Sequence, residues 1–211
     1  MVYWIILITQ AIFTTNLYVF TSYVSVFVQY KYGTSEIPLT EKLIFIFLGY
    51  SSVDSAIVAS MVCLCNMVTA PFAGYLAGRY GKRIYLTLLG SICMLIIHML
   101  FGFTNNLHPA ILTGFLGLVQ SVMDTSLMPS IGFVVDQSIY GRAYSLVVFV
   151  WNIGLMLVPI IIGSIMDRTE NDVFTANLVF VVLSSAAVVS SSFLFYVNKF
   201  KLGDLLNKSE K

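Results

Sequence analysis

The sequence predicts an all-α fold, a polytopic membrane protein built as a bundle of six transmembrane helices. Apolar residues make up 58% of the 211 positions and charged residues only 10%, whereas soluble domains carry about 25% charge. The mean hydropathy of +0.90 is far above what a soluble core requires. Long uncharged segments are the third observation, because about 20 apolar residues cross roughly 30 Å of hydrocarbon. The formal net charge of +1 gives no overall field that would attract nucleic acid.

Four uncharged stretches are each long enough for one crossing: 2–30, 55–78, 143–166 and 173–198. A fifth, from Ile84 to Met123, is almost long enough for two. Turn residues interrupt it at Thr104–Pro109, and a proline suits the first turn of a new helix. We therefore expect a domain over 1–199 and a cytoplasmic tail over 200–211, with spans near 3–30, 55–78, 84–103, 109–134, 143–166 and 173–198.

Six crossings place both termini on one side of the membrane, and the basic residues predict which side. With cytoplasmic termini, most Lys and Arg residues lie at cytoplasmic helix ends, as the positive-inside rule requires. The opposite ends then hold only Lys31, Lys42 and Arg168. The cytoplasmic set consists of Arg79, Lys82, Arg83, Arg142, Lys199, Lys201, Lys208 and Lys211.

One face of the first span carries a row of polar side chains. They advance by 4, 4, 3, 4 and 4 positions, so at about 100° per residue they share one arc of a helix. Polar groups facing lipid are unfavourable, so the row faces a cavity or a neighbouring helix. Hydrogen bonding between helices is the plainer explanation, but two glutamines and a tyrosine are bulkier than it needs. We interpret the row as a cavity lining: Gln10, Thr14, Tyr18, Thr21, Ser25 and Gln29.

Asp124 is the only charged residue placed deep within a predicted span. It lies about 15 residues, roughly 22 Å, from the non-cytoplasmic end of its helix, and Gln120 precedes it by one turn on the same face. An intramembrane carboxylate indicates a functional site by default, here a contact to a substrate amine or a protonatable group. A protonated, hydrogen-bonded packing residue fits the sequence equally well.

Enzymatic motifs are missing from the sequence. It contains no Gly-x-Ser-x-Gly elbow, His-Glu-x-x-His pair or phosphate-binding glycine loop, so we expect neither an enzyme nor a cofactor. Cys63 and Cys65 lack an accompanying His or second Cys pair, so they and Cys93 are interpreted as small packing residues rather than metal ligands. His98 lies within the third span, where a structural histidine is expected more often than a proton carrier.

The segment between the second and third spans carries a loop motif. Residues 74–83 are Gly-Tyr-Leu-Ala-Gly-Arg-Tyr-Gly-Lys-Arg. This run resembles Gly-x-x-x-Asp-Arg-x-Gly-Arg/Lys-Arg/Lys, the signature found at the same place in a six-helix repeat of the major facilitator superfamily. A second likeness, to the region between the tenth and eleventh helices of those transporters, is carried by Gly141–Tyr144, Asn152–Gly154, Pro159, Gly163 and Asp167.

The order of spans resembles the C-terminal half of these transporters over nearly the whole chain. Within the superfamily the chain looks closest to the lysosomal dipeptide-transporter branch, a likeness that rests on Gly49–Ser52, His98-Met99 and Tyr196–Asn198. The resemblance implies half of a major facilitator fold, in which two six-helix halves bind substrate between them. It also implies transport of a small organic solute, such as a dipeptide, by alternating access.

The resemblance further implies roles for particular residues. The first, fourth and fifth spans would line the cavity with Gln10, Thr14, Tyr18, Thr21, Gln120, Asp124 and Asn152. Gating would involve the loop and the kinked fifth span through Gly74, Arg79, Gly81, Lys82, Arg83 and Pro159. Gly78 replaces the acidic residue of the signature, so the charge relay of the family cannot form from this loop. The basic residues either anchor the topology or contact a gate, for which Asp136 is a candidate partner.

A single half can line a cavity but cannot close around it. We therefore expect a fragment or half-transporter that pairs with itself as a homodimer or with a second six-helix half. The alternative from another class is a non-transporting, degenerate half that binds or modulates a full-length transporter. A lysosomal or other vacuolar-type membrane is the expected location, with the plasma membrane as the alternative.

Overall fold

The computed structural model describes residues 1–32, 52–104 and 107–207. Within these ranges six helices are long and apolar enough to cross a membrane, which confirms the predicted fold class. They are α1 (Val2–Tyr32), α3 (Ser52–Tyr80), α4 (Arg83–Phe103), α5 (Pro109–Ser130), α6 (Tyr140–Arg168) and α7 (Val173–Lys201). Three short 3-10 helices, η1 (Ile131–Phe133), η2 (Gln137–Ile139) and η3 (Leu205–Asn207), lie between or after them.

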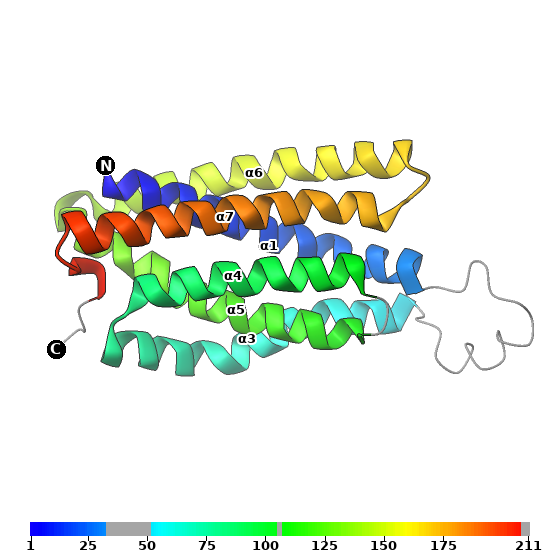
Figure 1. Ribbon diagram of the computed structural model, residues 1–211, viewed down its shortest axis with the longest axis horizontal. Helices are drawn as coiled ribbons and strands as arrows, with labels where there is room; N and C mark the ends of the chain where they lie inside the picture. The colour runs from blue at the N-terminus through cyan, green and yellow to red at the C-terminus, as the bar shows by residue number, and fades with distance from the viewer. Residues whose placement is uncertain (33–51, 105–106, 208–211) are drawn as a thin grey trace, which may run out of the picture.

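The helices run side by side along the long axis of the molecule, and the start of α1 and the end of α7 lie at the same end (Figure 1). Helix α1 packs against α7, α6, α3 and α5, so it forms the centre of the bundle. Helix α3 packs against α5, and α4 packs against both α5 and α7. The flanking helices α3 and α6 are the least enclosed by the rest of the chain.

Aromatic rings fill the contact between α1, α4 and α7. The ring of Phe20 lies edge-on to Phe101 and Phe180, each with centroids 5.2 Å apart, and such pairs add roughly 0.5–1.5 kcal/mol beyond their buried area. His98 is fully buried in this cluster, 4.6 Å from the Phe20 ring and stacked on Phe180. Neither of its ring nitrogens has a hydrogen-bond partner among the described residues, so its structural role stays a prediction.

Local sequence explains several helix ends. Pro109 occupies the first turn of α5 as expected, and the preceding His108 accepts a hydrogen bond from the Ala110 amide. Asp172 caps α7 by accepting from the amides of Phe174 and Thr175, which satisfies donors that a helix start leaves open.

The turn between α3 and α4 is tight. Gly81 and Lys82 have φ angles of 65° and 53°, values that glycine adopts without steric cost. The carbonyl of Asn207 accepts from the Lys82 amide and its side-chain oxygen accepts from Ile84 N. Residues 200–207, which we expected to belong to a tail, therefore extend α7 to Lys201 and fold back onto the start of α4.

Candidate functional site

The polar row of α1 changes its surroundings along the helix. Gln10 and Thr14 are buried within the bundle, whereas the Tyr18 side chain is 46% exposed. Thr21 and Ser25 are half-buried and Gln29 is exposed. The row is therefore covered by protein at its N-terminal end and becomes accessible near the middle of the helix.

Polar groups from α1 and α5 converge where these helices cross. Gln120 donates to the Tyr18 hydroxyl at 3.5 Å, and Gln10 donates to the Thr14 hydroxyl at 3.0 Å. The side chains of Gln10 and Gln120 also lie close enough to the Asp124 carboxyl to act as its hydrogen-bond donors. The structure thus brings together five of the residues that the sequence nominated. We call them the polar cluster: Gln10, Thr14, Tyr18, Gln120 and Asp124.

Neutral groups surround the carboxyl of Asp124. The side chains that interact with it include the Gln10 and Gln120 amides and the Tyr18 phenol. A carboxylate held away from water is costly unless it is paired with a cation or takes up a proton. The polar cluster can therefore bind an ammonium group or hold a proton.

A cavity of about 230 Å³ adjoins the polar cluster. Tyr18 and Gln120 belong to both the cavity and the polar cluster, and Thr21 of the α1 row is a further wall residue. Helix α3 supplies the opposite wall, with Val62, Cys63, Asn66 and Met67. We call this space the α3 cavity.

The contribution of α3 was missed at the sequence level. Cys63, which we interpreted as a small packing residue, is exposed and lines the α3 cavity. The spacing of Cys63, Asn66 and Met67 places them on one face of a helix, and Asn66 is a polar residue inside a span. That combination is the signal that could have identified this wall.

Close packing between α3 and α5 fixes the position of the cavity wall. A β-carbon added at Gly117 would lie 2.3 Å from the carbonyl oxygen of Val62 and 2.9 Å from the β-carbon of Cys65. Only glycine allows the backbones to approach so closely. Gly74 makes a looser contact with the same pair of helices, since an added β-carbon would be 3.7 Å from Thr125.

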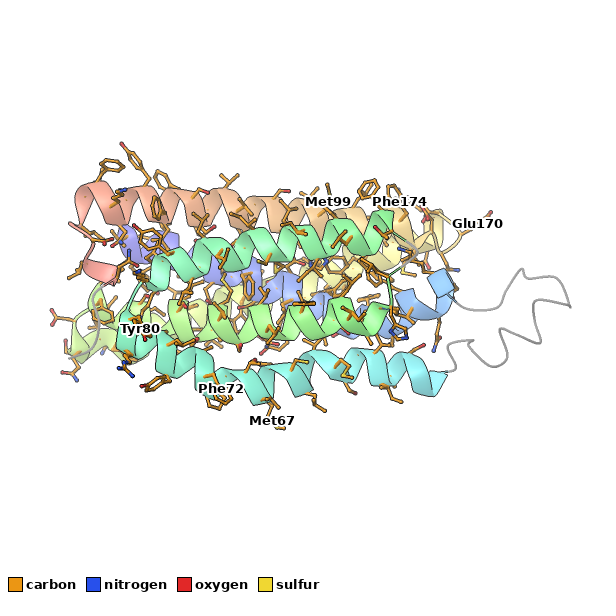
Figure 2. All side chains as sticks on the ribbon, turned by 60° about the horizontal axis from the view of Figure 1, so that its bottom comes forward. Met67, Phe72, Tyr80, Met99, Glu170 and Phe174 are labelled. Carbon is orange, nitrogen blue, oxygen red and sulfur yellow. The ribbon has the colours of Figure 1, made fainter. Side chains whose placement is uncertain are left out.

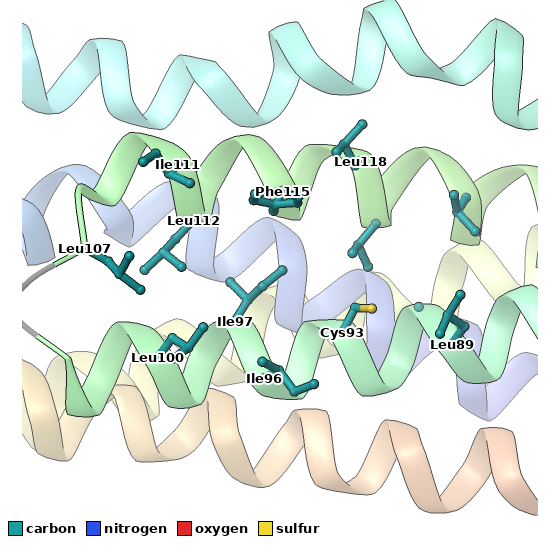
Figure 3. A pocket seen from close by; sticks show the side chains of 13 residues that line it. Leu89, Cys93, Ile96, Ile97, Leu100, Leu107, Ile111, Leu112, Phe115 and Leu118 are labelled. Atoms are coloured by element: carbon teal, nitrogen blue, oxygen red, sulfur yellow. The ribbon is translucent and has the colours of Figure 1, made fainter.

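A larger cavity, of about 470 Å³, lies between α4 and α5 (Figure 3). Its wall consists of apolar side chains, with Leu89, Cys93, Ile97, Phe115 and Leu118 among them. Ligand sites for polar solutes combine apolar walls with a few oriented polar groups, and this cavity exposes none. We therefore place the candidate site at the polar cluster and the smaller α3 cavity.

The structure does not bring Asn152 into the polar cluster. Its side chain is exposed on α6 and donates to the Val148 carbonyl of its own helix at 2.7 Å.

Nearby, Gly154 allows α6 to contact α1, because an added β-carbon would lie 2.1 Å from the Thr15 hydroxyl. Gly163 has no atom within 4 Å of such a β-carbon, so it makes no comparable contact within the described chain.

The candidate gating residues lie in two places. Arg79 contacts the hydroxyl of Tyr75 and lies 5.8 Å from the centre of the Tyr80 ring. Arg83 is buried, with its guanidinium 4.6 Å from the Phe133 ring of η1. The Arg83 contact links the start of α4 to the segment that follows α5.

Pro159 lies in α6, far along the chain from this turn, and its carbonyl accepts from the Tyr23 hydroxyl of α1 at 3.2 Å. Gly81 is buried in the α3–α4 turn and Lys82 is exposed there. The structure therefore divides the nominated set between the α3–α4 turn and the α1–α6 contact.

The sequence profile of the Major Facilitator Superfamily matches residues 6–210. The chain belongs to the major facilitator superfamily. This confirms the likeness that the α3–α4 loop carries, and the six spanning helices correspond to one half of that fold. The chain is accordingly an integral, multi-pass membrane protein.

Relatives within the superfamily carry transporter names. The Homo sapiens lysosomal dipeptide transporter MFSD1 is 30% identical over 173 residues, which cover 82% of this chain and 36% of the human protein. The Bos taurus protein of the same name is 30% identical over 179 residues, covering 85% of this chain and 36% of its own length. Protein ZINC INDUCED FACILITATOR 1 of Arabidopsis thaliana is 29% identical over 181 residues, covering 84% of this chain and 34% of its own. The chain therefore spans about a third of the length of the curated relatives it matches.

Proposed function

We propose that this major facilitator chain takes part in carrying a small organic solute with an amino group across a membrane, by alternating access. The polar cluster around Asp124, open to the α3 cavity, is the observation that carries the proposal. Tyr18, Cys63 and Gln120 each lie near the middle of their helices, and substrate sites of secondary transporters lie near the middle of the bilayer.

The chemistry of the polar cluster favours a cationic group. An ammonium beside Asp124 offsets the unfavourable burial of the carboxylate, and the hydroxyl of Tyr18 and the Gln120 amide can orient the rest of the solute. Dipeptides carry such an amino group, and relatives of this chain are named dipeptide transporters. Dipeptides are therefore the solute class that we propose first.

Transport requires a second six-helix half, which we propose covers the open faces of α3 and α6. Large apolar side chains project from these faces, as Met67 and Phe72 do from α3 (Figure 2). Phe149 and Met156 are similarly exposed on α6. The second half would belong to a longer chain, to a homodimer or to another protein. We propose cytoplasmic termini and a lysosomal or vacuolar-type membrane for the assembly.

Substitution of Asp124 tests the proposal. Asp124→Asn keeps the size and hydrogen bonding of the side chain but removes its charge. Losing one partner of a buried charge pair costs about 2 kcal/mol or more, so we expect uptake of radiolabelled alanylalanine into vesicles to fall about 30-fold at subsaturating concentration. Membrane insertion and protein level should stay normal.

The control is Asp167→Asn, because Asp167 is exposed at the end of α6 and its change should leave uptake intact. Wild-type uptake by Asp124→Asn, with only a lowered protein level for Asp124→Leu, would show that Asp124 is a packing residue. Normal uptake by Asp124→Leu would also remove the basis for an amine site. The degenerate, non-transporting half predicts no solute uptake by the assembled wild-type protein.

A further inference from the structure

The α3 cavity is distinct from the polar cluster that would hold the amino group. Tyr18 and Gln120 line this cavity and also belong to the polar cluster, whereas α3 forms the opposite wall. The Tyr18 ring borders the α3 cavity, and its hydroxyl accepts a hydrogen bond from Gln120, which lies one helical turn from Asp124. A solute whose amine meets Asp124 therefore has the α3 cavity beside it.

The size of the cavity limits what it can hold. A volume of about 230 Å³ corresponds to about seven or eight water molecules at roughly 30 Å³ each. An aliphatic or phenylalanine side chain has at most about seven non-hydrogen atoms and fits this space, whereas a tryptophan side chain, with about ten, would nearly fill it. Cys63 projects into this space, and Met67 is 71% exposed at its rim.

The chemistry of the wall disfavours an anionic occupant. The residues that line the cavity are uncharged, and an anionic occupant would be repelled by the neighbouring Asp124 carboxylate. Thr21, Asn66 and Gln120 supply hydrogen-bonding groups among the apolar side chains. This mixture of apolar surface with a few polar groups is typical of small-molecule sites.

Pro71 leaves the backbone carbonyl of Met67, beside this wall, without its usual helical hydrogen bond. Proline has no amide hydrogen, so a proline inside a helix removes the hydrogen bond to the carbonyl four residues earlier. In α3 that carbonyl belongs to Met67, and both residues are exposed. A solute amide N–H can therefore find a backbone acceptor at the rim of the cavity.

We propose that the α3 cavity is a side-chain subsite for an amine solute: it receives the uncharged side chain next to the amino group, and Cys63 sets the largest size it accepts. The inference rests on the proposed function, because it takes the amine to lie at Asp124. For a dipeptide, the selected group is the side chain of the first residue, which shares its carbon with the amine. Aliphatic and phenylalanine side chains are accepted, an indole side chain is at the limit of size, and acidic side chains are excluded.

Protection of the native thiol tests occupancy of the subsite directly. The assembled protein in membrane vesicles is treated with N-ethylmaleimide, and alkylation of the Cys63 and Cys93 peptides is followed by mass spectrometry. We expect leucylalanine or phenylalanylalanine to slow alkylation of Cys63 at least fivefold, and glutamylalanine to have no effect. Cys93 faces the apolar cavity between α4 and α5, so its rate should not respond to any of these solutes.

Changes in the size of residue 63 test selectivity. Cys63→Ala enlarges the cavity and should raise uptake of tryptophanylalanine relative to alanylalanine at least fivefold. Cys63→Leu fills the space and should lower uptake of phenylalanylalanine relative to alanylalanine by the same factor. The matched control is Cys93→Leu, which makes the same change in the cavity without polar groups and should leave both ratios unchanged.

Two outcomes separate this inference from the proposed function. If uptake depends on Asp124 but Cys63 is equally reactive with and without solute, the subsite is wrong and the amine site stands. If neither uptake nor protection occurs, the proposed function fails and the subsite fails with it. Equal ratios in the two Cys63 variants would also overturn the subsite, since the cavity would then not sense side-chain size.

Discussion

Replacing Gly117 by alanine should displace one wall of the α3 cavity, although Gly117 itself does not line it. Gly117 lies on α5 and faces the backbone of α3 at Val62. The added methyl group would come within 2.3 Å of the Val62 carbonyl oxygen, and no side-chain rotation can relieve a contact with backbone. An ordinary van der Waals contact requires about 3.4 Å, so α3 must move away from α5 by about 1 Å.

The expected cost follows from this displacement. Overpacking of a well-packed core costs about 1–3 kcal/mol, while alanine gains up to about 1 kcal/mol over glycine in a helix interior. For a chain of this size, each 1 kcal/mol corresponds to about 2–4 °C in Tm. A net loss of about 1–2 kcal/mol therefore predicts a Tm lower by roughly 2–8 °C. Moving the Cys63–Met67 wall by 1 Å should also lower solute uptake by up to about 100-fold.

The matched control is Gly114→Ala, three residues earlier on the same helix. Its β-carbon would meet only the Cys65 sulfur, at 3.4 Å, which is ordinary contact. We expect Gly114→Ala to match or slightly exceed the wild-type Tm in thermal unfolding monitored by tryptophan fluorescence, and to transport normally. Equal Tm values for the Gly117 and Gly114 variants would refute the reasoning, because they would show that α3 and α5 are not held at this distance.

Three further predictions concern the helix ends. Hydrogen bonds from Thr175 hold the pKa of the Asp172 carboxyl below its usual value. The ionised carboxylate therefore stabilises the fold above about pH 4. This stabilisation is lost as the pH falls through the lowered pKa. Asp172→Ala should lower Tm by about 2–4 °C at pH 7, a loss of about 1 kcal/mol, and by less at pH 3; an equal loss at both pH values would contradict this account. Lys82→Cys should resist an impermeant maleimide added from the non-cytoplasmic face, and efficient labelling there would reverse the proposed orientation. Arg79→Gln should slow solute uptake while leaving insertion unchanged if this residue acts at a gate, whereas altered orientation with normal uptake would identify it as a topology anchor.

The fold class was determined by the sequence alone because a bilayer imposes simple requirements. Spanning helices need long uncharged stretches, and the chain displays them with turn residues between, as at Thr104–Pro109. The family could also be identified from a local motif, since residues 74–83 form one continuous segment from the end of α3 to the start of α4. The convergence of Gln10, Gln120 and Asp124 could be anticipated as well, because polar groups in a membrane must face protein or water rather than lipid.

The partners of each helix face were decided only by the tertiary structure. Periodicity shows that Cys63, Asn66 and Met67 share a face, but not that α5 and α1 bring this face beside Asp124. That arrangement depends on the close approach at Gly117, where residues far apart in the chain meet backbone to backbone. Asn152 shows the converse, since the family likeness nominated it and the rotation of α6 leaves it hydrogen-bonded to its own helix. Helix rotation and spacing arise from packing between segments distant in sequence, so no local pattern could have specified which polar residues would form one site.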